Sequence, residues 1–169
     1  MLTRNSERLR KAPMEYRGLT AILFNPPLST GARTLARVDL AAKILGHQDA
    51  RIVNLFPIAT QSVLDVNLIG KDNDLWLSAR PEIAECLGSN ADTLLAYGCQ
   101  EPTGEVRAHF RAQIAWLHEE LRSAGGRSWS VSDRPRHPSR WQRHTARNYP
   151  GLPFIEALEL SLRQLPGTR

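Results

Sequence analysis

The chain has 169 residues and a mass of 19.0 kDa, which is enough for one ordinary domain. Hydrophobic residues make up 41% and charged residues 23%, a composition that supports a core and excludes a disordered chain. No apolar run approaches the roughly 18 residues of a membrane span, and the N-terminus lacks the apolar segment of a secretory signal. We therefore expect a soluble, cytoplasmic protein with a basic extension over residues 1–17 and a single domain over residues 18–169.

Several familiar sites are missing from the sequence. The two cysteines, Cys86 and Cys99, are too few for a structural zinc site or a cubane iron–sulfur cluster, and their apolar neighbours indicate buried free thiols. There is no phosphate loop, no GxGxxG, no HExxH, no zinc deaminase signature and no nucleophile elbow. The triplet Asp72-Asn73-Asp74 is more typical of a helix N-cap than of a metal site. We predict no metal and no cofactor.

The positive charge is concentrated in one segment. Lys and Arg number 22 against 17 Asp and Glu, a net charge of +5. Residues 127–147 contain six Arg, two His and one acidic residue, Asp133, and they also contain Trp129 and Trp141. Arg binds phosphate through two nitrogens and stacks on aromatic rings, so this segment is a candidate polyanion-binding surface. A solvated basic loop is the alternative that composition leaves open.

Short apolar runs bounded by Gly or Pro alternate with amphipathic stretches along the chain. The runs are typical of strands buried on both faces, and the amphipathic stretches are typical of helices. The predicted strands cover residues 18–25, 51–56, 92–97 and 127–132. The predicted helices cover residues 31–46, 73–87 (with a break or kink at Pro81), 105–123 and a last segment ending near Leu165. Residues 58–70 and 133–150 are predicted to be loops.

This alternation predicts a three-layer α/β/α sandwich with a four-stranded parallel sheet. In such sheets ligands bind beyond the carboxyl ends of the strands, near the point where strand order reverses. Four polar features fall there: Asn25 before two prolines, Asn54 inside an apolar strand, Tyr97-Gly98, and the segment from Arg136 to Arg140. Each has an ordinary structural explanation, but because all four lie at the carboxyl ends of the strands, we predict that they form one site.

The same features resemble motifs of a known superfamily. Asn25-Pro26-Pro27-Leu28-Ser29 resembles the N-P-G-L-S first motif of mismatch-specific uracil/thymine DNA glycosylases. His137-Pro138-Ser139 resembles the H-P-S second motif of the wider uracil-DNA glycosylase superfamily. Ile52-Val53-Asn54 and Leu95–Gly98 lie where that superfamily has an L-L-N strand and a strand ending in W-G. The order of the blocks agrees over roughly residues 18–145, and this resemblance implies a uracil-DNA-glycosylase-like fold.

A closer resemblance, block for block, is to an uncharacterised bacterial family. Its members carry an N-P-S motif, an N-L-F strand, an N-D helix start, a W-G strand end and an H-P loop. The corresponding blocks here are Asn25-Pro26-Pro27, Asn54-Leu55-Phe56, Asn73-Asp74, Tyr97-Gly98 and His137-Pro138.

The glycosylase resemblance implies roles for individual residues. Asn25 would hold the water that attacks C1′ of a flipped nucleotide, and His137 would donate to a carbonyl oxygen of the departing base. Asn54 would read the base edge, and Phe24 or Tyr97 would stack on the base. Phosphates would be held by Ser29, Arg136, Ser139, Arg140 and Arg143.

The sequence also departs from the glycosylase pattern. Pro27 stands where those enzymes have Gly, Arg140-Trp141 follows the second motif in place of small residues, and the first motif has no activating Asp. The sequence therefore leaves two alternative functions. One is a glycosylase-like hydrolase acting on the N-glycosidic bond of a flipped base in DNA or of a nucleotide. The other is a non-catalytic module that binds nucleic acid or a nucleotide on the same fold. The base, the kind of nucleic acid and the oligomeric state stay open.

Overall fold

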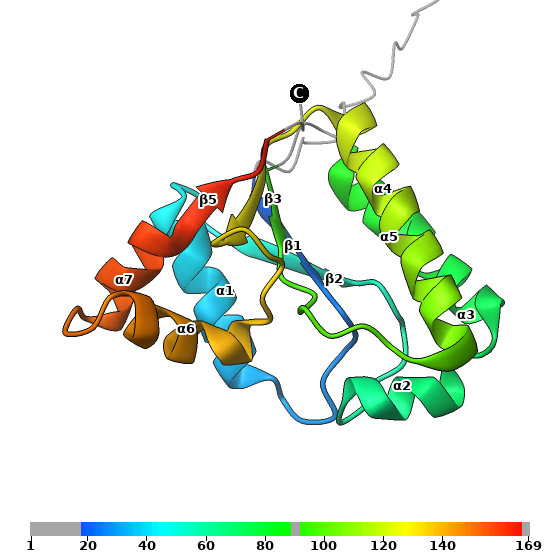
Figure 1. Ribbon diagram of the computed structural model, residues 1–169. Coiled ribbons are helices and arrows are strands. Elements are labelled where there is room, and N and C mark those ends of the chain that lie inside the picture. Colours follow the sequence, from blue (N-terminus) through cyan, green and yellow to red (C-terminus); the bar gives the residue numbers. More distant parts are fainter. Residues whose placement is uncertain (1–17, 89–91, 167–169) are drawn as a thin grey trace, which may run out of the picture.

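The computed structural model describes residues 18–88 and 92–166, so the predicted extension over residues 1–17 lies outside the described residues. Five strands form one sheet in the order β2-β1-β3-β4-β5 (Figure 1). They are β1 (Leu19–Leu23), β2 (Ala50–Asn54), β3 (Asp92–Leu95), β4 (Ser128–Val131) and β5 (Leu162–Gln164). Neighbours among the first four are parallel, and β5 is antiparallel to β4. The predicted α/β class is confirmed, with one strand more than the four expected.

The central strand, β1, is buried along its whole length because both of its faces carry apolar side chains. Ile22 belongs to one hydrophobic core together with Val53 of β2 and Leu95 of β3, its register partners. Leu23, its neighbour in sequence, belongs to the second core on the opposite face.

Helices cover both faces of the sheet (Figure 1). One face carries α2 (Val63–Ile69), α3 (Asn73–Ser78), α4 (Arg80–Leu87) and α5 (Gly104–Ala124). The other carries α1 (Ala32–Ile44), α6 (Trp141–Asn148) and α7 (Phe154–Ser161). The helix predicted over residues 105–123 is α5, and one side of it faces the core: Val106, Phe110, Leu117 and Leu121 are all buried.

The predicted break at Pro81 is confirmed. The segment predicted as one helix is divided into α3 and α4, and Pro81 lies in the first turn of α4, where its missing N–H is not needed. The N-cap interpretation of the triplet at the start of α3 is also confirmed, since the Asp72 carboxylate accepts the N–H of Asp74 at 2.9 Å.

The prediction of a helix to Leu165 is wrong, because α7 ends at Ser161. The chain then becomes extended and pairs with β4, which would otherwise be the edge strand of the parallel sheet. This pairing gives hydrogen-bond partners to backbone N–H and C=O groups of β4 that an edge strand leaves unpaired. Leu162 is buried in this strand, so the apolar pattern is kept while the backbone changes.

Both predicted loops contain helices. Within residues 58–70, α2 begins with a capping box in which Ser62 and Asp65 exchange hydrogen bonds. Within residues 133–150, the 3₁₀ helix η1 (Pro138–Arg140) leads into α6, whose Trp141 and Thr145 are buried one turn apart. The loop predictions failed because these segments are short and polar, although the S-x-x-D pattern at Ser62 was a usable signal.

The cysteine prediction is right for Cys86, which is buried, and wrong for Cys99, which is exposed because it follows the end of the buried β3 segment. His118 and Glu119 of α5 face solvent. Among the described residues, no group of three or more His, Cys, Asp or Glu is placed to hold a metal ion. Within residues 18–88 and 92–166, no helix combines the length and apolar character that crossing a membrane requires.

The strand order places a switch point beside β1. The chain passes from β1 to β2 on one side, and β3 then pairs with the other side of β1. The connections that leave the carboxyl ends of β1 and β3 therefore diverge, and a crevice forms between them in folds of this type.

Candidate functional site

Two adjoining cavities lie at the carboxyl ends of the strands. The first has a volume of about 440 Å³ and is named here the His137 cavity; Phe24, Asn25, Tyr97, Arg136, Ser139 and Arg140 also line it. The second, of about 320 Å³, is named the Asn54 cavity; Pro26, Pro27, Gly31 and Ile52 are among its lining residues. Asn25, Gln61 and His137 line both. The two motifs that sequence analysis singled out are thus brought together.

Asn25 lies two residues after the end of β1 and is half-buried. Its amide nitrogen donates to the carbonyl oxygen of Ile58 at 3.0 Å and to Oγ1 of Thr60 at 2.7 Å. Both amide hydrogens are therefore used, and Oδ1, which has no hydrogen-bond partner among the described residues, remains as an acceptor. The amide also tethers the loop after β2, and this places Gln61, which sequence analysis did not identify, beside both cavities.

His137 has a defined tautomer. Its Nδ1 accepts the backbone N–H of Ser139 at 3.2 Å and lies 2.9 Å from the Ser139 hydroxyl oxygen. A backbone N–H can only donate, so Nδ1 carries no proton and the neutral ring is protonated at Nε2. Burial, together with the nearby cations Arg140 and Arg37, lowers the pKa of His137 below its ordinary value of 6.5. At neutral pH His137 is therefore a neutral hydrogen-bond donor through Nε2.

Arg37 of α1 holds the segment that carries His137. Its guanidinium donates to the carbonyl oxygen of Pro138 at 2.7 Å and to Oε1 of Gln142 at 3.0 Å, and it lies 5.7 Å from the ring centroid of Phe154. These contacts join α1 to η1 and α6. Sequence analysis missed Arg37 because it lies in a helix far from every motif.

The end of β3 is tied to the same segment by Gly98. Its φ of +94° is a backbone conformation that glycine adopts easily and other residues rarely do. Its N–H donates to the carbonyl oxygen of Pro135 at 2.5 Å. Tyr97, immediately before it, is 9% exposed, and burial together with Cys99 raises the pKa of Tyr97 to about 12. Its phenol therefore stays protonated at neutral pH and presents an uncharged ring to the His137 cavity.

Asn54 ends β2 and lines the Asn54 cavity. The Oδ1 of this amide is buried and has no hydrogen-bond partner among the described residues. An unpaired buried acceptor costs about 1–3 kcal/mol. A ligand that donates an N–H in this cavity would remove that cost.

Three of the predicted site residues lie apart from the cavities or are engaged elsewhere. Phe24 is only 3% exposed and stacks on Phe110 with ring centroids 5.6 Å apart, so it offers little ring surface to a base. Ser29 and Arg143 are exposed, but neither cavity includes them among its lining residues. Trp141 is fully buried, and its indole N–H donates to the carbonyl oxygen of Arg136, so it is unavailable to a polyanion.

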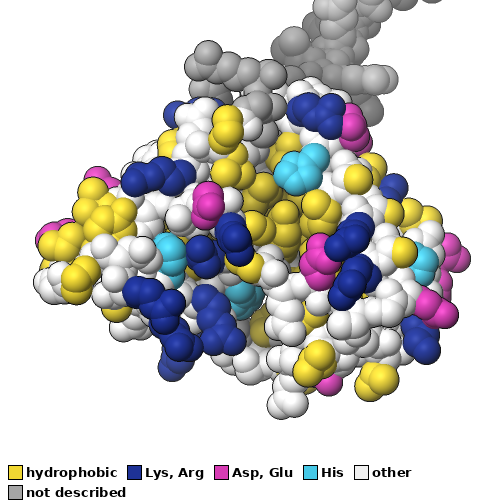
Figure 2. Space-filling model, viewed as in Figure 1, with side chains coloured by type: hydrophobic (Ala, Val, Ile, Leu, Met, Phe, Trp, Pro, Cys, Tyr) yellow, Lys and Arg dark blue, Asp and Glu magenta, His cyan; other side chains and the backbone are white. Residues whose placement is uncertain are grey.

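The electrostatic character of the site is positive. The described residues that line the His137 and Asn54 cavities include Arg136, His137 and Arg140 but no Asp or Glu. Nε of Arg136 is buried without a hydrogen-bond partner among the described residues. Figure 2 shows Lys and Arg side chains gathered at the lower left, over the corner where α1 and α6 meet. The arginines of these elements and of η1 are Arg33, Arg37, Arg140, Arg143 and Arg147.

Comparisons with family models, with curated proteins and with solved structures found no match to this chain.

Proposed function

We propose that the protein is glycosylase-like: it holds one nucleotide of a nucleic acid in the His137 and Asn54 cavities and hydrolyses its N-glycosidic bond. The observation that carries this proposal is that Asn25 and His137, from opposite parts of the chain, line the same two cavities. The predicted resemblance to the uncharacterised bacterial family and to uracil-DNA glycosylases belongs to the same proposal, because it rests on these residues.

Base recognition follows from the two unpartnered groups. Asn54 Oδ1 accepts an N–H from the base, and His137 Nε2–H donates to a carbonyl oxygen. A base edge with an N–H beside a carbonyl, as in uracil, thymine, hypoxanthine and xanthine, satisfies both groups. Cytosine presents an amino group and an unprotonated ring nitrogen at the corresponding positions and does not.

The reaction requires one water and the base. Asn25 Oδ1 accepts a hydrogen bond from the water, whose oxygen forms a bond to C1′ as the bond from C1′ to the base nitrogen breaks. His137 Nε2–H stabilises the negative charge that develops on the base carbonyl. The water proton ends on the departing base. An amide is a poor base, so turnover is slow.

A second candidate, a non-catalytic binding module, is favoured by two observations. No carboxylate is present among the described residues that line the two cavities. In addition, the ring of Pro27 packs so closely on the backbone that a Cβ on Gly31 would lie 2.8 Å from its Cγ. Pro27 therefore places a ring in the lining of the Asn54 cavity, at the position where the glycosylase motif has Gly.

Base release separates the two functions. We would measure single-turnover release from oligonucleotides carrying uracil, hypoxanthine, xanthine or mismatched thymine, using the wild type, His137→Ala and the control Arg122→Ala. Arg122 is exposed on α5, outside the basic segment, and lines neither cavity. We expect His137→Ala to slow release about 10²–10³-fold and Arg122→Ala to leave it within about threefold of the wild type. Binding without release by the wild type supports the binding module instead.

A further inference from the structure

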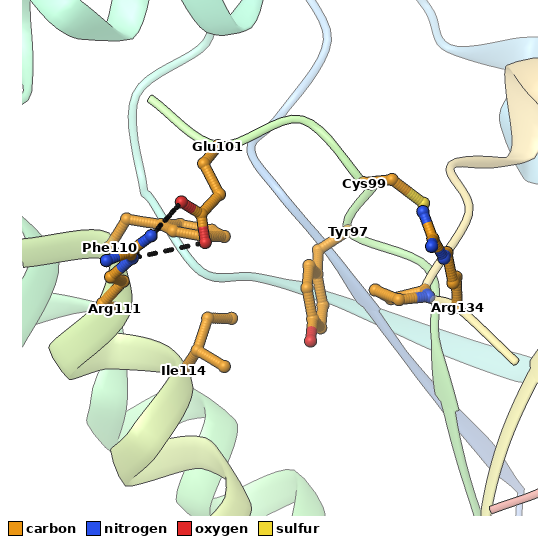
Figure 3. Close-up of a pocket in the computed structure, with 9 residues that line it drawn as sticks. Tyr97, Cys99, Glu101, Phe110, Arg111, Ile114 and Arg134 are labelled. Atoms are coloured by element: carbon orange, nitrogen blue, oxygen red, sulfur yellow. Dashed lines mark hydrogen bonds and ion pairs between the residues drawn. The ribbon is translucent and has the colours of Figure 1, made fainter. Parts of the chain in front are cut away.

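We propose a second nucleotide subsite beside the first, in a cavity of about 280 Å³ named here the Tyr97 cavity. It would hold the base that neighbours the nucleotide in the His137 cavity, so this inference rests on the proposed function. Figure 3 shows the ring of Tyr97 projecting between Ile114 of α5 and Arg134, with Phe110 and Glu101 on the α5 side.

The Tyr97 cavity is continuous with the candidate site. Tyr97, Gly98 and Cys99 line both it and the His137 cavity, so these three residues form a common wall. The segment after β4 contributes to both as well: Arg134 lines the Tyr97 cavity, and Arg136 lines the His137 cavity. A chain of nucleotides can therefore pass from one cavity to the other along a row of arginines.

The walls of the Tyr97 cavity suit a flat aromatic ring. Tyr97 and Phe110 meet edge to face, with ring centroids 6.4 Å apart, and Ile114 and Pro135 add apolar surface. Figure 2 shows a hollow near the middle of this face where hydrophobic side chains gather, with charged side chains around it. Aromatic side chains beside a basic groove are the usual way in which proteins bind successive unpaired bases.

The charges around this cavity specify the ligand further. Arg134 is exposed, and its guanidinium forms no hydrogen bond or ion pair with any described residue, so it is available to a phosphate. Glu101 is held by Arg111, whose Nη2 lies 2.9 Å from Oε2. A carboxylate has about four lone-pair sites, so Glu101 can also accept an exocyclic amino group. We infer that the neighbouring base is one with an amino group, such as cytosine, in preference to thymine.

This assignment narrows the substrate class to nucleic acid that is single-stranded or locally unpaired over two adjacent nucleotides. A paired neighbour could not place its ring against Tyr97, and a single nucleotide would occupy only one of the two cavities.

The test is binding of fluorescein-labelled single-stranded d(TC) repeats, which can fill both cavities, and of oligo(dT), which can fill only the first, measured by fluorescence anisotropy over a range of salt concentrations. Ile114→Trp fills the Tyr97 cavity and should weaken binding of the d(TC) repeats about five- to hundredfold. Arg134→Ala should lower the slope of log affinity against log salt by about 0.7. Glu101→Gln should reduce the preference for d(TC) repeats over oligo(dT). Arg122 is exposed on α5, the helix that carries Ile114, and Arg122→Ala is the control that should bind like the wild type.

The outcomes separate this inference from the proposed function. If Arg140→Ala weakens binding while Ile114→Trp and Arg134→Ala do not, the second subsite is wrong and the first cavity remains supported. If the wild type binds neither oligonucleotide, both proposals fail. Because Ile114 is partly buried, Arg134→Ala at the surface serves as the variant whose folding is not at issue, and thermal melting checks both.

Discussion

The guanidinium of Arg37 donates a 2.7 Å hydrogen bond to the carbonyl oxygen of Pro138, the residue that directly follows His137. Arg37 lines neither of the two cavities at the candidate site. It is therefore a positioning residue: α1 fixes η1 through it, and η1 fixes the histidine. Its positive charge also lowers the pKa of His137, behind burial and Arg140.

Substitutions at Arg37 should separate position from charge. Arg37→Lys keeps the charge but loses the paired geometry, so single-turnover base release should slow about 10- to 100-fold while the pKa of His137 stays low. Arg37→Gln should slow release similarly and also raise the pKa of His137. Release rates and NMR titration of the His137 ring measure the two effects. Full activity in both variants would contradict the positioning role.

Activity should depend on pH through His137. Protonation of Nδ1 would end its acceptance of the Ser139 N–H, so the active form is neutral, and release should be constant at neutral pH and fall on the acid side of pH 6.5. Arg140→Ala removes a nearby cation and should move the inflection to higher pH. The rate of release between about pH 5 and pH 8 measures it. An inflection that does not respond to Arg140→Ala would belong to another group.

The opposite end of the sheet should control acid stability. Asp92 begins β3, and its carboxylate accepts hydrogen bonds from Arg127 at 3.0 and 2.5 Å and lies 3.0 Å from Nε2 of His47. Burial opposes ionisation of Asp92, but the hydrogen bonds from Arg127 and His47 outweigh it and lower its pKa below 3.8. Because the pKa of Asp92 is lower in the folded than in the unfolded protein, the ionised carboxylate stabilises the fold at any pH above the unfolded-state pKa. This stabilisation is lost as the pH falls through the folded-state pKa.

Asp92→Asn should therefore lower the free energy of unfolding by about 1.5–3 kcal/mol at neutral pH, and the loss should disappear at low pH. Urea denaturation at several pH values measures it. Glu119→Gln, which breaks the exposed pair with Arg122, is the matched control and should change stability by less than about 0.5 kcal/mol. Equal effects of the two substitutions would contradict the assignment.

Asn25 has two roles that a pair of substitutions can separate. Asn25→Ala removes both the tether to Thr60 and the acceptor for water, so it should abolish base release. Thr60→Val removes only the hydroxyl of the tether, at a cost of about 0.5–1.5 kcal/mol in stability, and should retain most of the activity. Single-turnover release and thermal melting distinguish the two. If Thr60→Val is as inactive as Asn25→Ala, Asn25 acts only by holding the loop.

The sequence predicted the parallel sheet and its switch point because apolar runs such as residues 19–23 are local signals of buried strands. It did not predict β5, because Leu162 is buried in either backbone form and only the open edge of β4 decides between them. Asn25 and His137 could be identified as candidate site residues because each follows a predicted strand. It could not find Arg37, since the hydrogen bond to Pro138 joins distant parts of the chain.

The packing of the aromatic residues also could not be predicted from the sequence. Trp141 stands in the most basic segment, and its composition favoured a ligand-stacking role, but the start of α6 directs it into the core. Tyr97 could be placed at the end of a strand, yet its position between two cavities depends on Gly98 and on the loop that leads to His137.

The most direct test of the central claim is whether a base enters the Asn54 cavity. We would titrate the ¹⁵N-labelled Asn25→Ala protein, which should bind without releasing the base, with an oligonucleotide that carries one uracil and with the same oligonucleotide carrying an abasic site. Both should shift Arg signals through phosphate contacts, but only the uracil oligonucleotide should shift the side-chain amide of Asn54 and Nε2 of His137, because only it supplies an N–H and a carbonyl. Identical shifts with the two oligonucleotides, and an unchanged Asn54 amide, would contradict the account.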